Sequence, residues 1–262
     1  MIKLALVNQP AGLGDVLYTL NIGKKLVEQG YQVLWPLIQQ YMWLSKCIYI
    51  PGVKFISEDE IPQNLQNLYR SRYSNVIKEK DFAYFPLRYV LLNQEVGIED
   101  LPMLSKYMLA DMTKDAFSWW ELFGDALVLY PSKGEALFEK KQCGSTYFYV
   151  NDLVGSPDGK HLHTVESMNK NIYKTQIVRN CLEENYSLFD WWLILDKAKE
   201  IHTPDTGICF FVDILRNCFN LCKSTKFYMY PRDLNRPNVP QYLTSCFTFT
   251  NENRNGWNFV KP

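Results

Sequence analysis

The chain opens with a strand, a helix and a second strand within its first forty residues, and this order constrains the fold more than any other feature. The run from Lys3 to Asn8 is short and apolar, as in a buried strand. Apolar residues then recur at the spacing of one helix face, at Leu13, Val16, Leu17 and Leu20. Gly30 stands where this helix would end, and YQVLWPL predicts the second strand. Because a helix between neighbouring strands crosses over the sheet, the strands must be parallel.

The same pattern starts again in the second half of the chain. STYFYVND and TKFYMYPR predict strands, the latter being the last core strand, and SLFDWWLILDKAKEIH and ICFFVDILRN predict helices. We therefore expect an α/β fold with two Rossmann-like lobes, each with a parallel sheet, facing a central cleft. The segment PSKGEALFEKKQCG is expected to be a helix followed by a loop, and we place the boundary there. Residues 1–142 would form the N-terminal lobe and residues 143–262 the C-terminal lobe.

Shorter elements are expected between these two patterns. VKFIS and FAYFPL predict strands, and LPMLSKYMLADM and DAFSWWELF predict helices. The chain has 262 residues, of which 47% are hydrophobic. This length and composition allow two domains of roughly 100–150 residues, each with its own core.

Charge and composition disfavour several classes of function. The chain has 28 basic and 28 acidic residues and no long basic stripe, which disfavours a nucleic-acid partner. It contains no stretch of 18 apolar residues and no signal-peptide pattern, so no membrane span is predicted. The seven cysteines and three histidines show no zinc-site spacing. We expect reduced thiols, a cytoplasmic location and no metal, and the sequence leaves the oligomeric state open.

The stretch GLGD opens the first helix and is the first candidate functional motif. Gly12 and Gly14 allow a tight turn and a close approach of the backbone to a ligand. The stretch lacks the third glycine of the dinucleotide fingerprint and the Gly-Lys-Ser/Thr of a P-loop. Asp15 has two interpretations. It can cap its own helix, because a helix N-terminus favours negative charge, or it can act as a base held over a cleft.

The stretch HTPDTG precedes another predicted helix in the second half. The backbone N–H groups of Thr206 and Gly207 would lie at the helix N-terminus, an arrangement that binds phosphate or sugar oxygens. Asp205 would repel a diphosphate, so we interpret it as an acceptor for sugar hydroxyls or as a helix cap. An ordinary capped helix is the alternative for the whole stretch.

The loop NDLVGSPDGK is the third candidate, since Ser156 and Lys160 could neutralise a phosphate. A surface loop with an ordinary lysine is the alternative interpretation. His161 and His163 follow without a third ligand, so no metal site is expected there. His202 is more typical of a packed or hydrogen-bonded histidine than of a catalytic one.

GLGDVLYTL together with DTG resembles the lipopolysaccharide heptosyltransferase group, whose members are inverting glycosyltransferases with two Rossmann-like lobes in the GT-B arrangement. The match to the family's first motif covers Gly14, Asp15, Val16, Leu17, Thr19 and Leu20. Tyr18 and Asn21 stand where the family often has His and Pro. The Asp-Thr-Gly at 205–207 matches the second motif, and Phe210 stands where the family usually has His.

The resemblance implies roles for the matching residues. Asp15 would be the general base that acts on the acceptor hydroxyl. Thr206 and Gly207 would bind the donor pyrophosphate, Asp205 would contact the sugar, and Lys160 would take the place of a phosphate-neutralising lysine. The residues expected to bind the donor are Gly12, Gly14, Ser156, Lys160, Asp205, Thr206 and Gly207.

The function implied is that of an inverting, metal-independent glycosyltransferase of hexosyl- or heptosyltransferase type. It would move a sugar from a nucleotide-diphosphate sugar to a hydroxyl of a glycan acceptor, without a further cofactor. The alternative is a non-catalytic nucleotide- or glycan-binding protein with a degenerate transferase fold, which Phe210 favours. A Rossmann enzyme that uses NAD or S-adenosylmethionine is disfavoured by the missing third glycine. The residue usage is similar to that of short glycosyltransferase-like proteins from large DNA viruses or phages.

Overall fold

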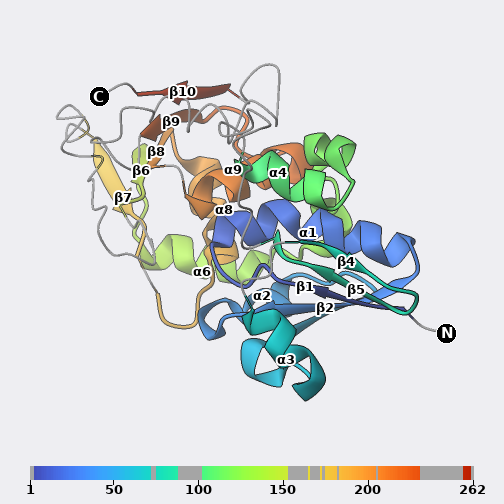
Figure 1. Cartoon of the computed structure of the whole chain (residues 1–262). Coiled ribbons are helices and arrows are strands. Elements are labelled where there is room, and N and C mark those ends of the chain that lie inside the picture. The colour runs from blue at the N-terminus through green and yellow to red at the C-terminus, as the bar shows by residue number, and fades with distance from the viewer. Residues whose placement is uncertain are drawn as a thin grey trace. The chain divides into compact units, whose positions relative to one another are not determined.

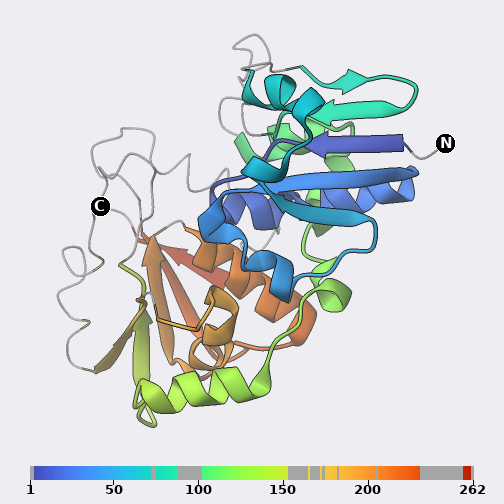
Figure 2. The same cartoon turned by 90° about the horizontal axis from the view of Figure 1, so that it is seen from below.

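The computed structural model of the chain describes residues 3–71, 75–87, 102–152, 165, 172, 175–181, 183–204, 206–230 and 256–260. The chain divides into two compact units, Met1–Leu127 and Val128–Pro262 (Figure 1). Each unit contains a five-stranded sheet with helices packed on it (Figure 2). No helix of these described ranges has both the length and the apolar character needed to cross a membrane.

The first unit is built on a sheet with the strand order β3-β2-β1-β5-β4. Its strands are β1 (Lys3–Val7), β2 (Tyr31–Leu37), β3 (Val53–Ser57), β4 (Ile77–Lys78) and β5 (Phe82–Phe85). β1 pairs in parallel with both β2 and β5, so that Ala5 lies opposite Val33 and Ala83. β3 continues the parallel set and β4 is antiparallel to β5. The last three residues of β1 are buried, as in a strand covered on both faces.

Helix α1 connects β1 to β2 and buries the face that the sequence predicts. The helices of this unit are α1 (Leu13–Glu28), α2 (Leu44–Cys47), α3 (Gln63–Arg70), α4 (Pro102–Leu109) and α5 (Phe123–Ala126), with 3-10 helices η1 (Gln39–Tyr41), η2 (Glu58–Glu60) and η5 (Thr113–Ser118). α1 packs against β2, α4 and η5. The hydroxyl of Tyr107 on α4 donates to the carbonyl of Tyr18 on α1 at 2.6 Å, and the two rings meet edge to face. This pair fixes α4 against α1.

The second unit has the strand order β10-β9-β8-β6-β7, and all its neighbouring strands are parallel. The strands are β6 (Tyr147–Val150), β7 (Gln176–Arg179), β8 (Glu200–Pro204), β9 (Lys226–Tyr230) and β10 (Trp257–Phe259). The mainly parallel sheet of the first unit and the parallel sheet of the second confirm the expected α/β fold class. TKFYMYPR was expected to be the last core strand, and this is wrong because β10 pairs beyond it. A strand of three residues is too short to show a strand pattern in the sequence.

The helices of the second unit are α6 (Pro131–Lys140), α8 (Trp192–Lys197) and α9 (Gly207–Phe219), with the 3-10 helix η7 (Leu188–Trp191). The stretch SLFDWWLILDKAKEIH was expected to form one helix, but it forms η7 followed by α8. Its last residues belong to strand β8. Asp190 accepts hydrogen bonds from the backbone N–H and the hydroxyl of Ser187, which form a capping box before η7. α9 follows β8 directly and buries every residue from Ile208 to Leu215.

The boundary between the units lies before α6, whereas the sequence places it after this helix, between residues 142 and 143. α6 packs against α8 and η7, which belong to the second unit. Its buried Gly134 lies under the Trp192 indole, where a larger side chain would collide with the ring. α6 therefore completes the core of the second unit.

The core of the first unit gives a stability prediction with a matched control. Phe123 is fully buried in α5 and packs edge to face on Trp119, whereas Phe117 is 49% exposed. We expect Phe123→Ala to lower the free energy of unfolding by about 3–5 kcal/mol, because it leaves a cavity that the core fills only in part. Phe117→Ala should change it by less than about 1 kcal/mol. Urea unfolding followed by tryptophan fluorescence measures both, and equal losses would contradict this description of the core.

Candidate functional site

The start of α1 in the first unit has an unusual backbone geometry. β1 ends at Val7, and Gly12 is the N-cap of α1 with a φ of 78°. This left-handed conformation favours glycine. A Cβ at this position would also lie within 3.0 Å of Oδ2 of Asp15, closer than real Cβ contacts. Glycine is therefore required at position 12 both by the backbone and by the Asp15 carboxylate, while Gly14 is buried in the first turn.

Asp15 is the third residue of α1 and lies in its first turn, where a negative charge suits the helix N-terminus. The N-cap residue is Gly12, which has no side chain that could make a capping hydrogen bond. Its carboxylate forms an ion pair through Oδ1 with the ammonium of Lys106 on α4. The Lys106 side chain is only 8% exposed, whereas that of Asp15 is 39% exposed. One face of the pair is therefore closed by protein and the other is open.

Gln9 holds the buried ammonium from the other side. Its Oε1 accepts a hydrogen bond from Nζ of Lys106 at 2.6 Å, and its Nε2 donates to the carbonyl of Ala11 at 2.7 Å. The Gln9 carbonyl accepts from the indole N–H of Trp35 at 3.2 Å. The bond to Ala11 fixes the side-chain amide of Gln9, so that its oxygen faces Lys106, and the Trp35 bond anchors the Gln9 backbone. A row of hydrogen bonds thus runs from the sheet to the Asp15 carboxylate.

Sequence reasoning missed Lys106 and Gln9. Lys106 stands inside the apolar stretch LPMLSKYMLADM, next to the fully buried Tyr107. A lysine on the buried face of a helix requires a partner, and this was the signal available in the sequence. The partner itself is 91 residues away along the chain, so it could not be identified without the fold.

The second unit presents the start of α9 at the end of β8. Thr206 is the N-cap residue and Gly207 is the first residue of the helix. The Thr206 hydroxyl accepts a hydrogen bond from the Asn151 side chain at 3.0 Å and lies 3.3 Å from the Thr203 hydroxyl. Asn180 in turn donates to the side-chain oxygen of Asn151 at 3.0 Å. This network fixes the N-terminus of α9, whose first-turn N–H groups can bind an anion.

The structure describes only part of the expected donor set. Thr206 and Gly207 come together at the start of α9, and the buried Asn151 joins them although sequence reasoning did not select it. Ser156, Lys160 and Asp205 lie outside the described residues, as do His161 and His163.

Two further residues have clear structural roles. His202 is buried on β8, where its ring stacks on Tyr228 and its nitrogens lie 2.8 Å from the Tyr230 hydroxyl and 3.1 Å from Glu200. Burial lowers the pKa of His202, although Glu200 opposes this shift. The interpretation of His202 as a packed histidine is confirmed. Phe210 is buried in α9.

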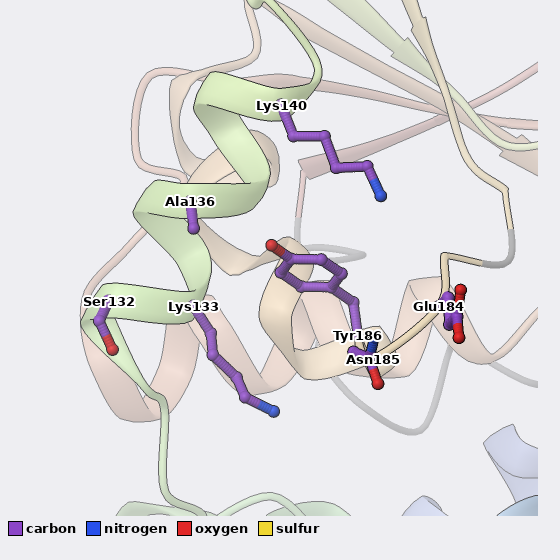
Figure 3. A pocket seen from close by; sticks show the side chains of 7 residues that line it. All are labelled: Ser132, Lys133, Ala136, Lys140, Glu184, Asn185 and Tyr186. Carbon is purple, nitrogen blue, oxygen red and sulfur yellow. The ribbon is translucent and has the colours of Figure 1, made fainter.

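A hollow of about 370 Å³ lies beside α6 in the second unit (Figure 3). Its lining residues are Ser132, Lys133, Ala136, Lys140, Glu184, Asn185 and Tyr186. Lys140 is already paired with Glu183 at 2.6 Å, and Glu184 adds a second negative charge. These carboxylates balance the two lysines, so the hollow has no excess positive charge for a diphosphate. None of the residues predicted from the sequence lines it.

Metal ligands do not gather in the described part of the chain. Among those residues, no group of three or more His, Cys, Asp or Glu side chains has a geometry that could hold a metal ion.

No protein-family model and no curated protein matches this chain. Among solved structures, it is similar to a family 9 glycosyl transferase of Veillonella parvula, with 7% identity, a TM-score of 0.45 and coverage of 99% of this chain and 86% of that one. It is also similar to TibC, an iron-containing dodecameric glycosyltransferase of enterotoxigenic E. coli, with 10% identity and a TM-score of 0.47. The similarity covers 90% of this chain and 60% of TibC. The E. coli heptosyltransferase WaaC with ADP is a third similar structure, with 10% identity and a TM-score of 0.36. The similarity covers 97% of this chain and 98% of WaaC. No residue role follows from likenesses at this level.

The geometry at Gly12 predicts an energetic coupling between Gly12 and Lys106. Gly12→Ala should lower the free energy of unfolding by about 1–2 kcal/mol, because alanine disfavours the left-handed backbone conformation at this position. The added Cβ should also displace the Asp15 carboxylate. The loss of unfolding free energy caused by Lys106→Met should then be about 1 kcal/mol smaller in the Gly12→Ala variant than in the wild type, because the ion pair is already disturbed.

The matched control uses Gly30, which has a φ of 89° and no neighbouring atom within 4 Å of the point that a Cβ would occupy. Gly30→Ala and Lys106→Met should be additive to within about 0.5 kcal/mol. Urea unfolding of the single and double variants measures both cycles. Equal coupling in the two cycles would contradict the contact between position 12 and Asp15.

Proposed function

We propose that this protein is an inverting, metal-independent glycosyltransferase that moves a sugar from a nucleotide-diphosphate sugar to a hydroxyl of a glycan acceptor. The observation that carries the proposal is the state of Asp15. Its carboxylate lies in the first turn of α1, is held by the buried Lys106, and is open on one side. Such a carboxylate can accept a proton from a bound hydroxyl.

The two carboxylate oxygens of Asp15 have different surroundings. Oδ1 is paired with Lys106, whereas Oδ2 faces the position of the missing side chain of Gly12. We assign proton acceptance to Oδ2, because the pairing at Oδ1 withdraws that oxygen from other partners. Lys106 is a positioning residue that fixes the carboxylate, and Gln9 fixes Lys106.

In the proposed reaction, Asp15 removes the proton of the acceptor hydroxyl as its oxygen attacks the anomeric carbon of the donor. The bond from this carbon to the diphosphate breaks on the opposite face, so the configuration inverts. The leaving diphosphate is stabilised by the first-turn N–H groups of α9 at Thr206 and Gly207. Lys160 and Ser156 would add positive charge and a hydrogen bond, and Asp205 would contact the sugar.

The proposal places the enzyme in the cytoplasm. Cys47, Cys143, Cys181, Cys209, Cys218 and Cys222 carry free thiols. Free thiols are typical of proteins that remain in a reducing compartment.

A non-catalytic nucleotide- or glycan-binding protein is the alternative, and the buried Phe210 favours it. Phe210 stands where the resembled family usually has His, and it is only 4% exposed. A buried phenylalanine cannot exchange a proton or bind a phosphate. Measurement of donor hydrolysis or transfer distinguishes the two functions.

Asp15→Asn should lower kcat by about 10²–10⁴-fold, because the amide cannot accept the proton. The variant should keep its fold and its affinity for nucleotide, since asparagine retains an oxygen that can accept from Lys106. Asp125→Asn is the matched control, because Asp125 is an exposed aspartate in the first turn of α5. Transfer is followed by mass spectrometry of the glycosylated acceptor. Wild-type turnover in Asp15→Asn would remove Asp15 as the base.

Nucleotide binding should stabilise the protein against heat. A nucleoside diphosphate at about 100 times its Kd adds about 2.7 kcal/mol to the free energy of unfolding, which raises Tm by about 5–10 °C. We expect one of UDP, GDP, ADP, CMP or dTDP to produce this shift, and NAD and S-adenosylmethionine to produce none. Lys160→Met should reduce the shift, whereas Lys199→Met, at an exposed lysine of the same unit, should not. No shift with any of the nucleotides would argue against the donor site.

A further inference from the structure

A lysine, a cysteine and a glutamate meet at the edge of the second unit, and the proposed transfer reaction uses none of them. Lys141 follows the last residue of α6, and Cys181 and Glu183 follow β7. Nζ of Lys141 lies 2.8 Å from Sγ of Cys181. Oε1 of Glu183 lies 3.1 Å from Sγ of Cys181 and forms an ion pair with Lys141. The three groups therefore form one compact cluster.

The distance between the lysine nitrogen and the cysteine sulfur is short for a hydrogen bond. Because sulfur is larger than oxygen, an N–H···S hydrogen bond is about 0.4 Å longer than the usual N–H···O distance of about 2.9 Å. At 2.8 Å the two atoms are in direct contact, so one oxygen atom could join them without a large movement of either side chain.

The cluster is also held in place and open to small reagents. The ammonium of Lys141 lies 5.2 Å from the ring centroid of the buried Trp191, which limits the positions that the lysine can take. Cys181 is half-buried, and the side chains of Lys141 and Glu183 are 17% and 14% exposed. A hydroperoxide can therefore reach the sulfur while the lysine stays beside it.

We propose that Lys141 and Cys181 form a covalent bridge through one oxygen atom when the protein meets a hydroperoxide. One hydrogen peroxide oxidises the thiol of Cys181 to a sulfenic acid and releases one water. A second oxidises the Lys141 amine to a hydroxylamine and releases another water. The hydroxylamine oxygen then attacks sulfur, the sulfenic hydroxyl leaves as a third water, and the S–O–N bridge is complete. Two peroxides accept four electrons, two from sulfur and two from nitrogen.

Glu183 positions the Lys141 nitrogen, and solvent takes the proton that this nitrogen must lose. Burial lowers the pKa of Lys141, but hydrogen bonds to Cys181 and Glu183 outweigh this effect, and the lysine stays charged at rest. It must therefore lose a proton before its nitrogen reacts. Hydrogen bonds from Lys140, Lys141 and Cys181 lower the pKa of Glu183 to about 2, so this carboxylate is ionised and holds the lysine nitrogen beside the sulfur. It is too weak a base to keep the lysine proton, which leaves to solvent water.

The bridge would join two segments that are 40 residues apart along the chain. It would tie the end of α6 to the segment after the edge strand β7. A covalent link of this kind restricts the unfolded chain as a disulfide does. Because the bonds to sulfur and nitrogen can be reduced, a thiol reductant should reverse it.

The test is the mass of the full-length protein after treatment with hydrogen peroxide. The bridge adds one oxygen and removes two hydrogens, so we expect a gain of about 14 Da that dithiothreitol reverses. Trypsin should no longer cleave after Lys141, and the peptides that contain Lys141 and Cys181 should remain joined. Cys181→Ser and Lys141→Arg should both abolish the gain of about 14 Da. The matched variants Cys143→Ser and Lys140→Arg should retain it.

Other results would overturn the proposal. Gains of about 16, 32 or 48 Da on Cys181 in both the wild type and Lys141→Arg would indicate simple thiol oxidation without the lysine. A loss of about 2 Da would indicate a disulfide or a direct S–N bond. An unchanged mass for the peptides of both residues would show that the cluster does not react. None of these outcomes depends on transferase activity.

Discussion

Parallel strands impose one constraint on both units, because a helix that follows such a strand begins at the carboxyl edge of the sheet. α1 follows β1 at this edge in the first unit, and α9 follows β8 at this edge in the second. The first N–H groups of each helix lack intrahelical partners and carry the positive end of its dipole. In the first unit this end lies beside the Asp15–Lys106 pair, and in the second it presents Thr206 and Gly207.

Much of the fold follows from local patterns in the sequence. VKFIS matches β3 residue for residue, and the apolar spacing from Leu13 to Leu20 gives the buried face of α1. The patterns fail where tertiary contacts decide the local conformation. DAFSWWELF was predicted as one helix, but the chain forms η5 and then α5, with Trp119 buried between them. Trp119 packs against Tyr18 of α1 and Phe123 of α5, so tertiary contacts override the local helix propensity here.

The sequence predicted where the backbone of the candidate site lies, at the glycine-marked helix starts, but not which distant side chains join it. Glycine spacing indicates where a helix start approaches a ligand, and Gly12 has the positive φ that this requires. The residues that contact Asp15 and Thr206 come from distant segments of the chain. Lys106 reaches Asp15 from α4, and Asn151 reaches Thr206 across two neighbouring strands. Neither partner belongs to a local motif, so neither could be inferred from spacing along the chain.

Asp15 and Lys106 form an ion pair whose two partners are unequally buried. A buried ammonium needs partners, because an unpaired charge away from water is costly. Gln9 and Asp15 supply them, and this accounts for the position of Lys106. In the proposed reaction, Asp15 would act through Oδ2, the oxygen that is not paired with Lys106.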